Sequence, residues 1–121
     1  MTIPLYFDKV KRMQPVDSVW KIASARQLAE TIVDIGDAQT MQNFLCDVMT
    51  KKEIIEISSR FEAAKMLQQG KKYTEIIEKT KLSSRTIARI SDWMQNGRGG
   101  YEAALKIVNA HHTHIPPARA E

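Results

Sequence analysis

YTEIIEKTKLSSRTIARISDWMQN, residues 73–96, has the pattern of two short helices joined by a tight turn. Thr74 is expected to be the N-cap of the first helix, because its hydroxyl can accept a hydrogen bond from a first-turn amide. The second helix is expected to begin at Ser83 or Ser84, and its apolar residues then recur every three or four positions. This layout is typical of a helix-turn-helix, whose second helix lies in the DNA major groove.

A second interpretation of this hairpin stays open, because any helical hairpin needs caps, a turn and an apolar stripe. Lys81 lies where many such turns carry glycine in a left-handed conformation, which costs a lysine about 1 kcal/mol. The alternative is therefore a helical protein-interaction module that does not bind DNA. A steep salt dependence of DNA binding would separate the two, because phosphate contacts release counterions.

Composition and charge indicate a small all-α protein with a basic half. The chain has 121 residues, enough for one domain, and no alternating apolar-polar run that would indicate a strand. Residues 60–100 hold nine Lys and Arg against four Asp and Glu, whereas the rest holds nine against ten. A surplus of positive charge around the hairpin is expected where phosphates are bound.

No feature of the sequence predicts an enzyme, a metal site or a cofactor. Cys46 lies in an apolar helical pattern and is expected to be a small core residue. The histidines, His111, His112 and His114, stand in a proline-rich tail that would not hold a metal in fixed geometry. No apolar run is long enough to span a membrane, so we expect a cytoplasmic protein without membrane contact.

The N-terminal half is expected to supply a dimer interface. An arm at 1–15 should lead into a helical domain at 16–110, followed by a flexible tail at 111–121. The first helix should run from Asp17 to Ile35 with Asp17 or Ser18 as its cap, and its apolar residues cover more than one stripe. Such a helix needs two partners, and in a short chain one of them can be a second copy. The residues expected in that interface are Trp20, Leu28 and Ile32.

Three further helices are expected around the hairpin. Asp37 should cap a second helix, and Thr50 with Glu53 forms a capping box that begins a third. Gly70 should end this third helix, and a last helix should run over 101–110. The core face expected for the third helix is formed by Ile54, Ile57, Phe61, Ala64 and Leu67.

The order of these features resembles the Trp repressor superfamily, and within it the YerC/YecD-like branch. The resemblance rests on the capping box, Arg60, Gly70, the SSRTIARI segment at 83–90 and the closing NGRGGYEAAL at 96–105. It implies a six-helix Trp-repressor-like fold and an intertwined homodimer. It also implies a transcriptional regulator, a repressor, that binds double-stranded DNA at a near-palindromic operator. The residues expected at the DNA are Lys71, Lys72, Thr74, Lys79, Lys81, Ser83, Ser84, Arg85, Thr86 and Arg89.

The same resemblance bears on a small-molecule effector. In Trp repressor two arginines hold the bound tryptophan, and they correspond here to Arg60 and Arg89. The position after the second arginine is glycine in that repressor but Ile90 here, and Trp93 replaces a small residue. Both changes are expected to fill the effector site. We therefore predict DNA binding without tryptophan, and an amino-acid-gated repressor remains the alternative.

Overall fold

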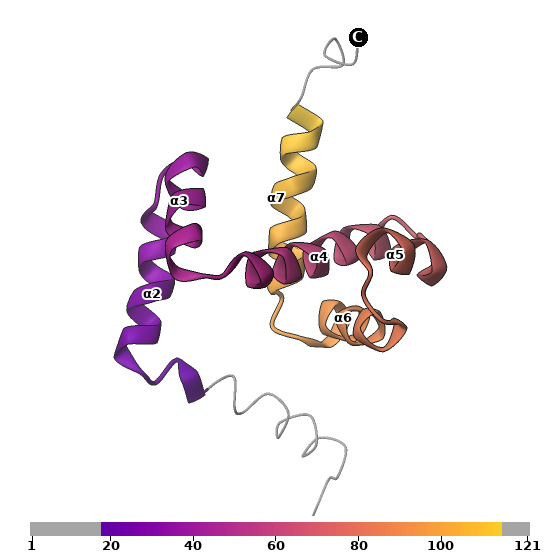
Figure 1. The fold of residues 1–121 in the computed structure, drawn as a ribbon, viewed down its shortest axis with the longest axis horizontal. Helices are drawn as coiled ribbons and strands as arrows, with labels where there is room; N and C mark the ends of the chain where they lie inside the picture. The colour runs from indigo at the N-terminus through magenta and orange to yellow at the C-terminus, as the bar shows by residue number, and fades with distance from the viewer. Residues whose placement is uncertain (1–17, 115–121) are drawn as a thin grey trace, which may run out of the picture. The chain divides into compact units, whose positions relative to one another are not determined.

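The computed structural model describes residues 18–114, and the chain divides between Val48 and Met49 into two compact units. The described part of the chain contains no strand, which confirms the all-α prediction (Figure 1). The first unit holds α2 (Ala23–Asp34) and α3 (Ala38–Val48). The second unit holds α4 (Lys51–Gln68), α5 (Tyr73–Thr80), α6 (Ser84–Asn96) and α7 (Gly100–His114). The expected arm at 1–15 and residues 115–121 of the expected tail lie outside the described residues.

The first predicted helix is interrupted near its start. Ser18 and Val19 are helical, and residues 20–22 form a turn and a bend, in which Lys21 N–H donates to the carbonyl of Ser18 and Ile22 N–H to that of Val19. Ile22 then has an extended backbone, so α2 starts at Ala23 and has no side-chain cap. The predicted continuous helix from Asp17 to Ile35 is therefore wrong, because residues 20–22 interrupt it, and Asp17 itself lies outside the described residues. The guanidinium of Arg26 donates to the Trp20 carbonyl at 2.8 Å, which helps to hold this separate turn.

Neither helix of the first unit has a buried residue. Its junction is nevertheless well capped: Asp37 Oδ1 accepts from Thr40 N–H at 2.8 Å, which confirms Asp37 as the cap of α3. Cys46 is exposed, so its predicted place in the core is wrong. Two short helices cannot enclose a core by themselves, and the apolar pattern of α3 therefore does not produce burial within this unit.

The long helix α4 begins and ends as its local sequence predicts. Thr50 N–H donates to Glu53 Oε1 at 2.8 Å, and Glu53 N–H donates to Thr50 Oγ1 at 3.1 Å, which confirms the capping box. At the other end Gly70 takes a φ of 81°. Lys71 N–H donates to the Met66 carbonyl at 2.9 Å, the crossing bond of a Schellman motif. The glycine therefore turns the chain toward α5.

The core of the second unit lies where α4, α5, α6 and α7 meet (Figure 1). Among the described residues, the buried apolar side chains are Ala63, Ala64, Met66, Ile76, Ile87, Ile90 and Leu105. Of the face predicted for α4, Ala64 is buried, and Phe61 and Leu67 pack against this cluster. Ile57 is exposed, so its predicted core position is wrong. The small residues Ala63 and Ala64 allow the crossing helices to approach α4 closely.

The last helix is longer than predicted. α7 runs from Gly100 to His114, so the predicted bounds of 101 and 110 are wrong, and a flexible tail after the helix stays a prediction. Gly97 N–H donates to the Trp93 carbonyl at 2.9 Å at the end of α6, and Gly99 has a φ of 84°. Leu105 fixes α7 in the core cluster.

Candidate nucleic-acid interface

The hairpin begins at a cap different from the predicted one. Lys72 is the N-cap of α5, and its N–H donates to Glu75 Oε1 at 3.2 Å. Thr74 lies inside the first turn of the helix, so its predicted role as N-cap is wrong. The hydroxyl of Thr74 and the ammonium groups of Lys71 and Lys72 are on exposed residues at this end of α5. They are therefore available to a ligand.

A buried hydroxyl and a left-handed residue fix the turn between α5 and α6. Thr80 is only 7% exposed; its Oγ1 donates to the Ile76 carbonyl at 2.7 Å and accepts from Leu82 N–H at 3.2 Å. Lys81 has φ 65° and ψ 14°, and its N–H donates to the Ile77 carbonyl at 2.8 Å. Leu82 packs against the core cluster. Hydrogen bonds before and after Lys81, together with the packing of Leu82, therefore fix the turn, as the predicted helix-turn-helix requires.

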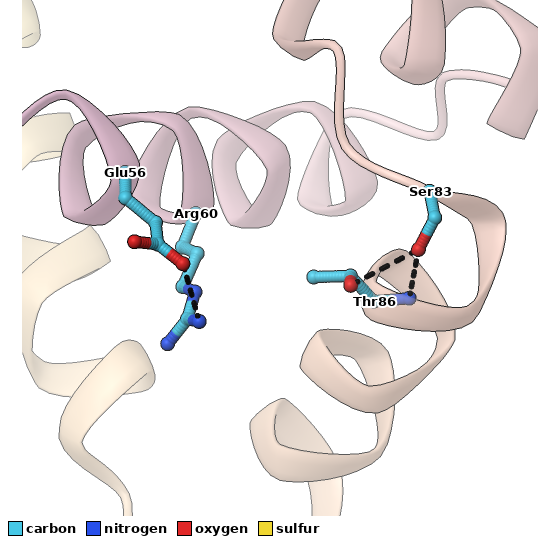
Figure 2. A network of polar contacts seen from close by, with 4 residues as sticks. All are labelled: Glu56, Arg60, Ser83 and Thr86. Atoms are coloured by element: carbon cyan, nitrogen blue, oxygen red, sulfur yellow. Dashed lines mark hydrogen bonds and ion pairs between the residues drawn. The ribbon is translucent and has the colours of Figure 1, made fainter. Parts of the chain in front are cut away.

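Ser83 and Thr86 cap the N-terminus of α6. Ser83 is the N-cap, and its Oγ accepts from Thr86 N–H at 3.1 Å. The Ser83 hydroxyl also donates to Thr86 Oγ1 at 3.1 Å, and Figure 2 shows both bonds. The Ser83 hydroxyl therefore caps the helix, while the neighbouring Ser84 hydroxyl is left on an exposed residue.

The helix α6 has two contrasting faces. Ile87 and Ile90 are completely buried in the core cluster. The opposite face carries short polar or small groups and two guanidinium groups, and each of its residues is exposed: Ser84, Arg85, Ala88 and Arg89. The buried face therefore fixes α6 on the unit, and the exposed face presents donors to the outside.

The basic residues around this face have no acidic partner within the described chain. Their side chains make no hydrogen bond or ion pair with any residue in the 18–114 range. They are Lys71, Lys72, Lys79, Lys81, Arg85 and Arg89. Six unpaired cations in so short a stretch form a surface suited to a polyanion.

The two arginines expected at an effector site have different surroundings. Arg60 Nη2 donates to Glu56 Oε2 at 3.2 Å (Figure 2), whereas its Nε is buried without a partner among the described residues. Burial raises the pKa of the nearby Tyr101 hydroxyl, and the positive charge of Arg60 partly opposes this shift. Arg89 is exposed. Within the described residues, no hydrogen bond or common partner joins the two arginines.

The two bulky residues near these arginines also differ. Ile90 is fully buried beneath α6, whereas Trp93 is 39% exposed. Ile90 therefore fills the space beneath α6, whereas Trp93 remains partly open to solvent.

Several residues that shape this surface were missed by the sequence analysis. The sequence indicated the role of Thr80 only weakly: a threonine at a helix end can donate a hydrogen bond to a carbonyl of the preceding turn. The sequence also indicated the role of Glu56 weakly, since a carboxylate four residues before an arginine on one helix can form an ion pair with it. Nothing in the sequence indicated that Tyr101 lies near Arg60, because only the fold brings α7 toward that residue.

The described part of the chain contains neither a metal-binding cluster nor a membrane-spanning helix. No group of three or more His, Cys, Asp or Glu residues in this part of the chain could hold a metal ion. No helix in the same part is both long enough and apolar enough to cross a membrane.

The fold and this surface define a helix-turn-helix protein, in which α5 and α6 form the motif. The family model of Trp repressor protein matches residues 23–109, so the chain belongs to the Trp repressor family. It is 34% identical to YerC, an uncharacterized protein of Bacillus subtilis, over 82 residues that make up 68% of this chain and 79% of YerC.

Two solved structures have the same fold. A TrpR-like protein from Eubacterium eligens is 34% identical with a TM-score of 0.71, over 76% of this chain and 95% of that one. A candidate Trp repressor from Staphylococcus aureus is 30% identical with a TM-score of 0.68, over 73% and 88%. These matches confirm the predicted family and the predicted Trp-repressor-like fold.

Proposed function

We propose that the chain is a cytoplasmic, sequence-specific DNA-binding repressor that acts as a homodimer through the α5–α6 hairpin. One observation carries this proposal: α6 buries Ile87 and Ile90 and exposes Arg85 and Arg89, which belong to a group of six cations without a partner in the described part of the chain. A helix fixed on one face and rich in donors on the other is suited to base edges and phosphates. Membership of the Trp repressor family supports the choice of DNA as the polyanion.

The two ends of the hairpin have different tasks in this proposal. Arg85 and Ser84 lie in the first turn of α6, from which side chains of a recognition helix reach base edges. The lysines and Thr74 on α5 and the turn contact phosphates, which position the protein but do not read the sequence. Ser83 and Thr86 cap the N-terminus of α6 and so hold its first turn in a helical conformation for DNA binding. Arg89 lies one turn further along and can contact a phosphate or a base.

Arg85 and Lys72 provide the test. DNA selected from genomic fragments and a mixed-sequence duplex are titrated at several salt concentrations. Arg85→Ala should lose about 1–3 kcal/mol on selected DNA and relax its preference. Lys72→Ala should weaken both DNAs alike and lower the salt slope by about one per bound subunit.

Lys106→Ala is the matched control, because Lys106 is an exposed lysine on α7. It should change neither preference nor slope. A wild-type protein with a shallow salt slope would favour the protein-interaction module instead. Equal losses on both DNAs for both hairpin variants would show that α6 is not the recognition helix.

The dimer is supported by apolar side chains in α2 and in the turn before it that are not buried. Trp20 is 46% exposed and Leu28 is 48% exposed, while Ile32 is half-buried. Exposed apolar surface of this kind is suited to a second copy of the same helices. Sedimentation should find a dimer at micromolar concentration, and Leu28→Lys should shift it toward monomer. A folded wild-type monomer would contradict this part of the proposal.

Tryptophan independence is supported by the complete burial of Ile90. A β-branched side chain at this position leaves no open slot next to Arg89 for an indole, and forcing one in would cost more than the ~1–3 kcal/mol of ordinary overpacking. Binding of selected DNA should be the same with and without millimolar L-tryptophan. A tenfold gain in affinity would favour the alternative, an amino-acid-gated repressor.

A further inference from the structure

The turn of the hairpin contains an unusual backbone position. Among the described residues, three have a left-handed backbone, with φ between 65° and 84°: Gly70, Lys81 and Gly99. Glycine adopts this conformation without steric cost, whereas a residue with a Cβ is strained in it. The chain thus uses glycine at two of its left-handed turns and a lysine at the third.

The structure around Lys81 does not allow the strain to relax. Its own N–H is bound to the Ile77 carbonyl, and the next amide, that of Leu82, is bound to the buried Thr80 hydroxyl. Leu82 in turn packs against the core cluster. Any residue at position 81 must therefore take the left-handed conformation, and strain that persists in this way often marks a functional position.

Nothing within the described chain compensates for this cost. The ammonium of Lys81 makes no hydrogen bond or ion pair with any residue in that part of the chain. A cation near the C-terminus of α5 would be favourable, but Lys79 already lies in the last turn of that helix. Lys81 also adds a further charge to a group of unpaired cations.

We propose that the hairpin keeps a lysine in this left-handed turn because its ammonium group binds a DNA phosphate, although glycine there would give the more stable protein. This inference rests on the proposed DNA-binding function and goes beyond it, since it assigns a cost in stability to one contact. Lys81 lies two residues before the N-cap of α6. A cation at that place would bind the phosphate backbone beside the groove that α6 enters.

Three variants separate the strain from the charge. Lys81→Gly removes both, Lys81→Ala removes the charge and keeps the strained Cβ, and Lys81→Arg keeps both. Thermal unfolding is measured at one protein concentration, and binding to a mixed-sequence duplex is measured across a salt series. The exposed Lys106→Ala on α7 serves as the control for the loss of one charge elsewhere.

The expected pattern is an opposite response of stability and binding. Lys81→Gly should melt a few degrees higher than the wild type. Both Lys81→Gly and Lys81→Ala should bind DNA more weakly at low salt, with a salt slope lower by about one per bound subunit. Lys81→Arg should retain the wild-type slope, and so should Lys106→Ala.

Three outcomes would overturn the inference. If Lys81→Gly and Lys81→Ala bind DNA like Lys106→Ala, with the slope unchanged, the lysine is not a phosphate contact and the proposed function still stands. If Lys81→Gly melts at or below the melting temperature of the wild type, glycine is not the more stable choice and the claimed cost is absent. If the wild type itself binds without salt dependence, both the inference and the proposed function fail.

Discussion

Replacing Ile90 by alanine should destabilise the protein by about 2.5–4 kcal/mol. Ile90 is 0% exposed and belongs to the cluster that holds α6 against α4. The substitution removes three carbon atoms, each worth about 0.8 kcal/mol when buried, so the transfer of apolar surface accounts for about 2.4 kcal/mol. The cavity left beneath α6 adds to this cost. The better helix propensity of alanine returns only about 0.4 kcal/mol.

Urea unfolding followed by circular dichroism measures this difference at one fixed protein concentration, because a dimer's stability depends on concentration. Ile107→Ala on α7 is the matched control, since Ile107 is 59% exposed, and it should cost less than about 1 kcal/mol. Equal losses for the two variants would show that Ile90 does not support α6 as the structure indicates.

The same position links stability to the effector. Ile90→Gly opens the slot next to Arg89 and loosens α6, so its affinity for selected DNA should fall. Millimolar L-tryptophan should restore part of that affinity in Ile90→Gly and change nothing in Ile107→Ala. If tryptophan leaves Ile90→Gly unaffected, then Ile90 is not the residue that closes an indole site.

Three further predictions concern single contacts. Thr80→Val should cost about 1–3 kcal/mol in urea unfolding, because Leu82 N–H loses its partner in a partly buried turn. Gly97→Ala should lower the melting temperature, because a Cβ there would lie 2.5 Å from the Trp93 carbonyl oxygen; an unchanged melting temperature would show that the end of α6 can shift freely. Thr40 N–H lowers the pKa of Asp37 below its ordinary value of 3.8, so Asp37 stabilises α3 above that pH and the contribution is lost as the pH falls through the lowered value. Acid titration followed by circular dichroism should therefore show a steeper loss of helix below pH 3.8 in the wild type than in Asp37→Asn.

The features that sequence predicted well are those decided by a few neighbouring residues. The Thr50–Glu53 capping box, the Asp37 cap and the glycine at the end of α4 each depend on contacts across three to five positions. The left-handed backbone of Lys81 is of the same kind, because the turn alone requires it. Because these features depend on hydrogen bonds between neighbouring residues, both the order of the helices and the helical hairpin could be predicted from the sequence.

The sequence analysis missed two kinds of feature. In one kind, two neighbouring residues could each cap the same helix; in the other, contacts between helices determine which residues are buried. Thr74 is a good N-cap residue, yet Glu75 can satisfy the Lys72 amide, and α5 therefore starts two residues earlier than a cap at Thr74 allows. Ile57 has helical spacing with the core face of α4 but is exposed, because the crossing helices contact the later turns around Ala63 and Ala64. Periodicity indicates which face is apolar, and it does not indicate how far along a helix the partner reaches.

The distribution of buried residues connects folding with DNA binding. All the buried apolar residues of the described chain lie in the second unit, while α2 and α3 bury none. If a second copy covers α2, then dimerisation supplies the core that the first unit lacks, and the stability of the protein rises with its concentration. DNA binding by two hairpins should then weaken more steeply on dilution than one-to-one binding allows. Leu28→Lys, which acts on α2 and leaves the hairpin intact, should reproduce that loss at high concentration, and an unchanged affinity in this variant would show that each hairpin binds DNA alone.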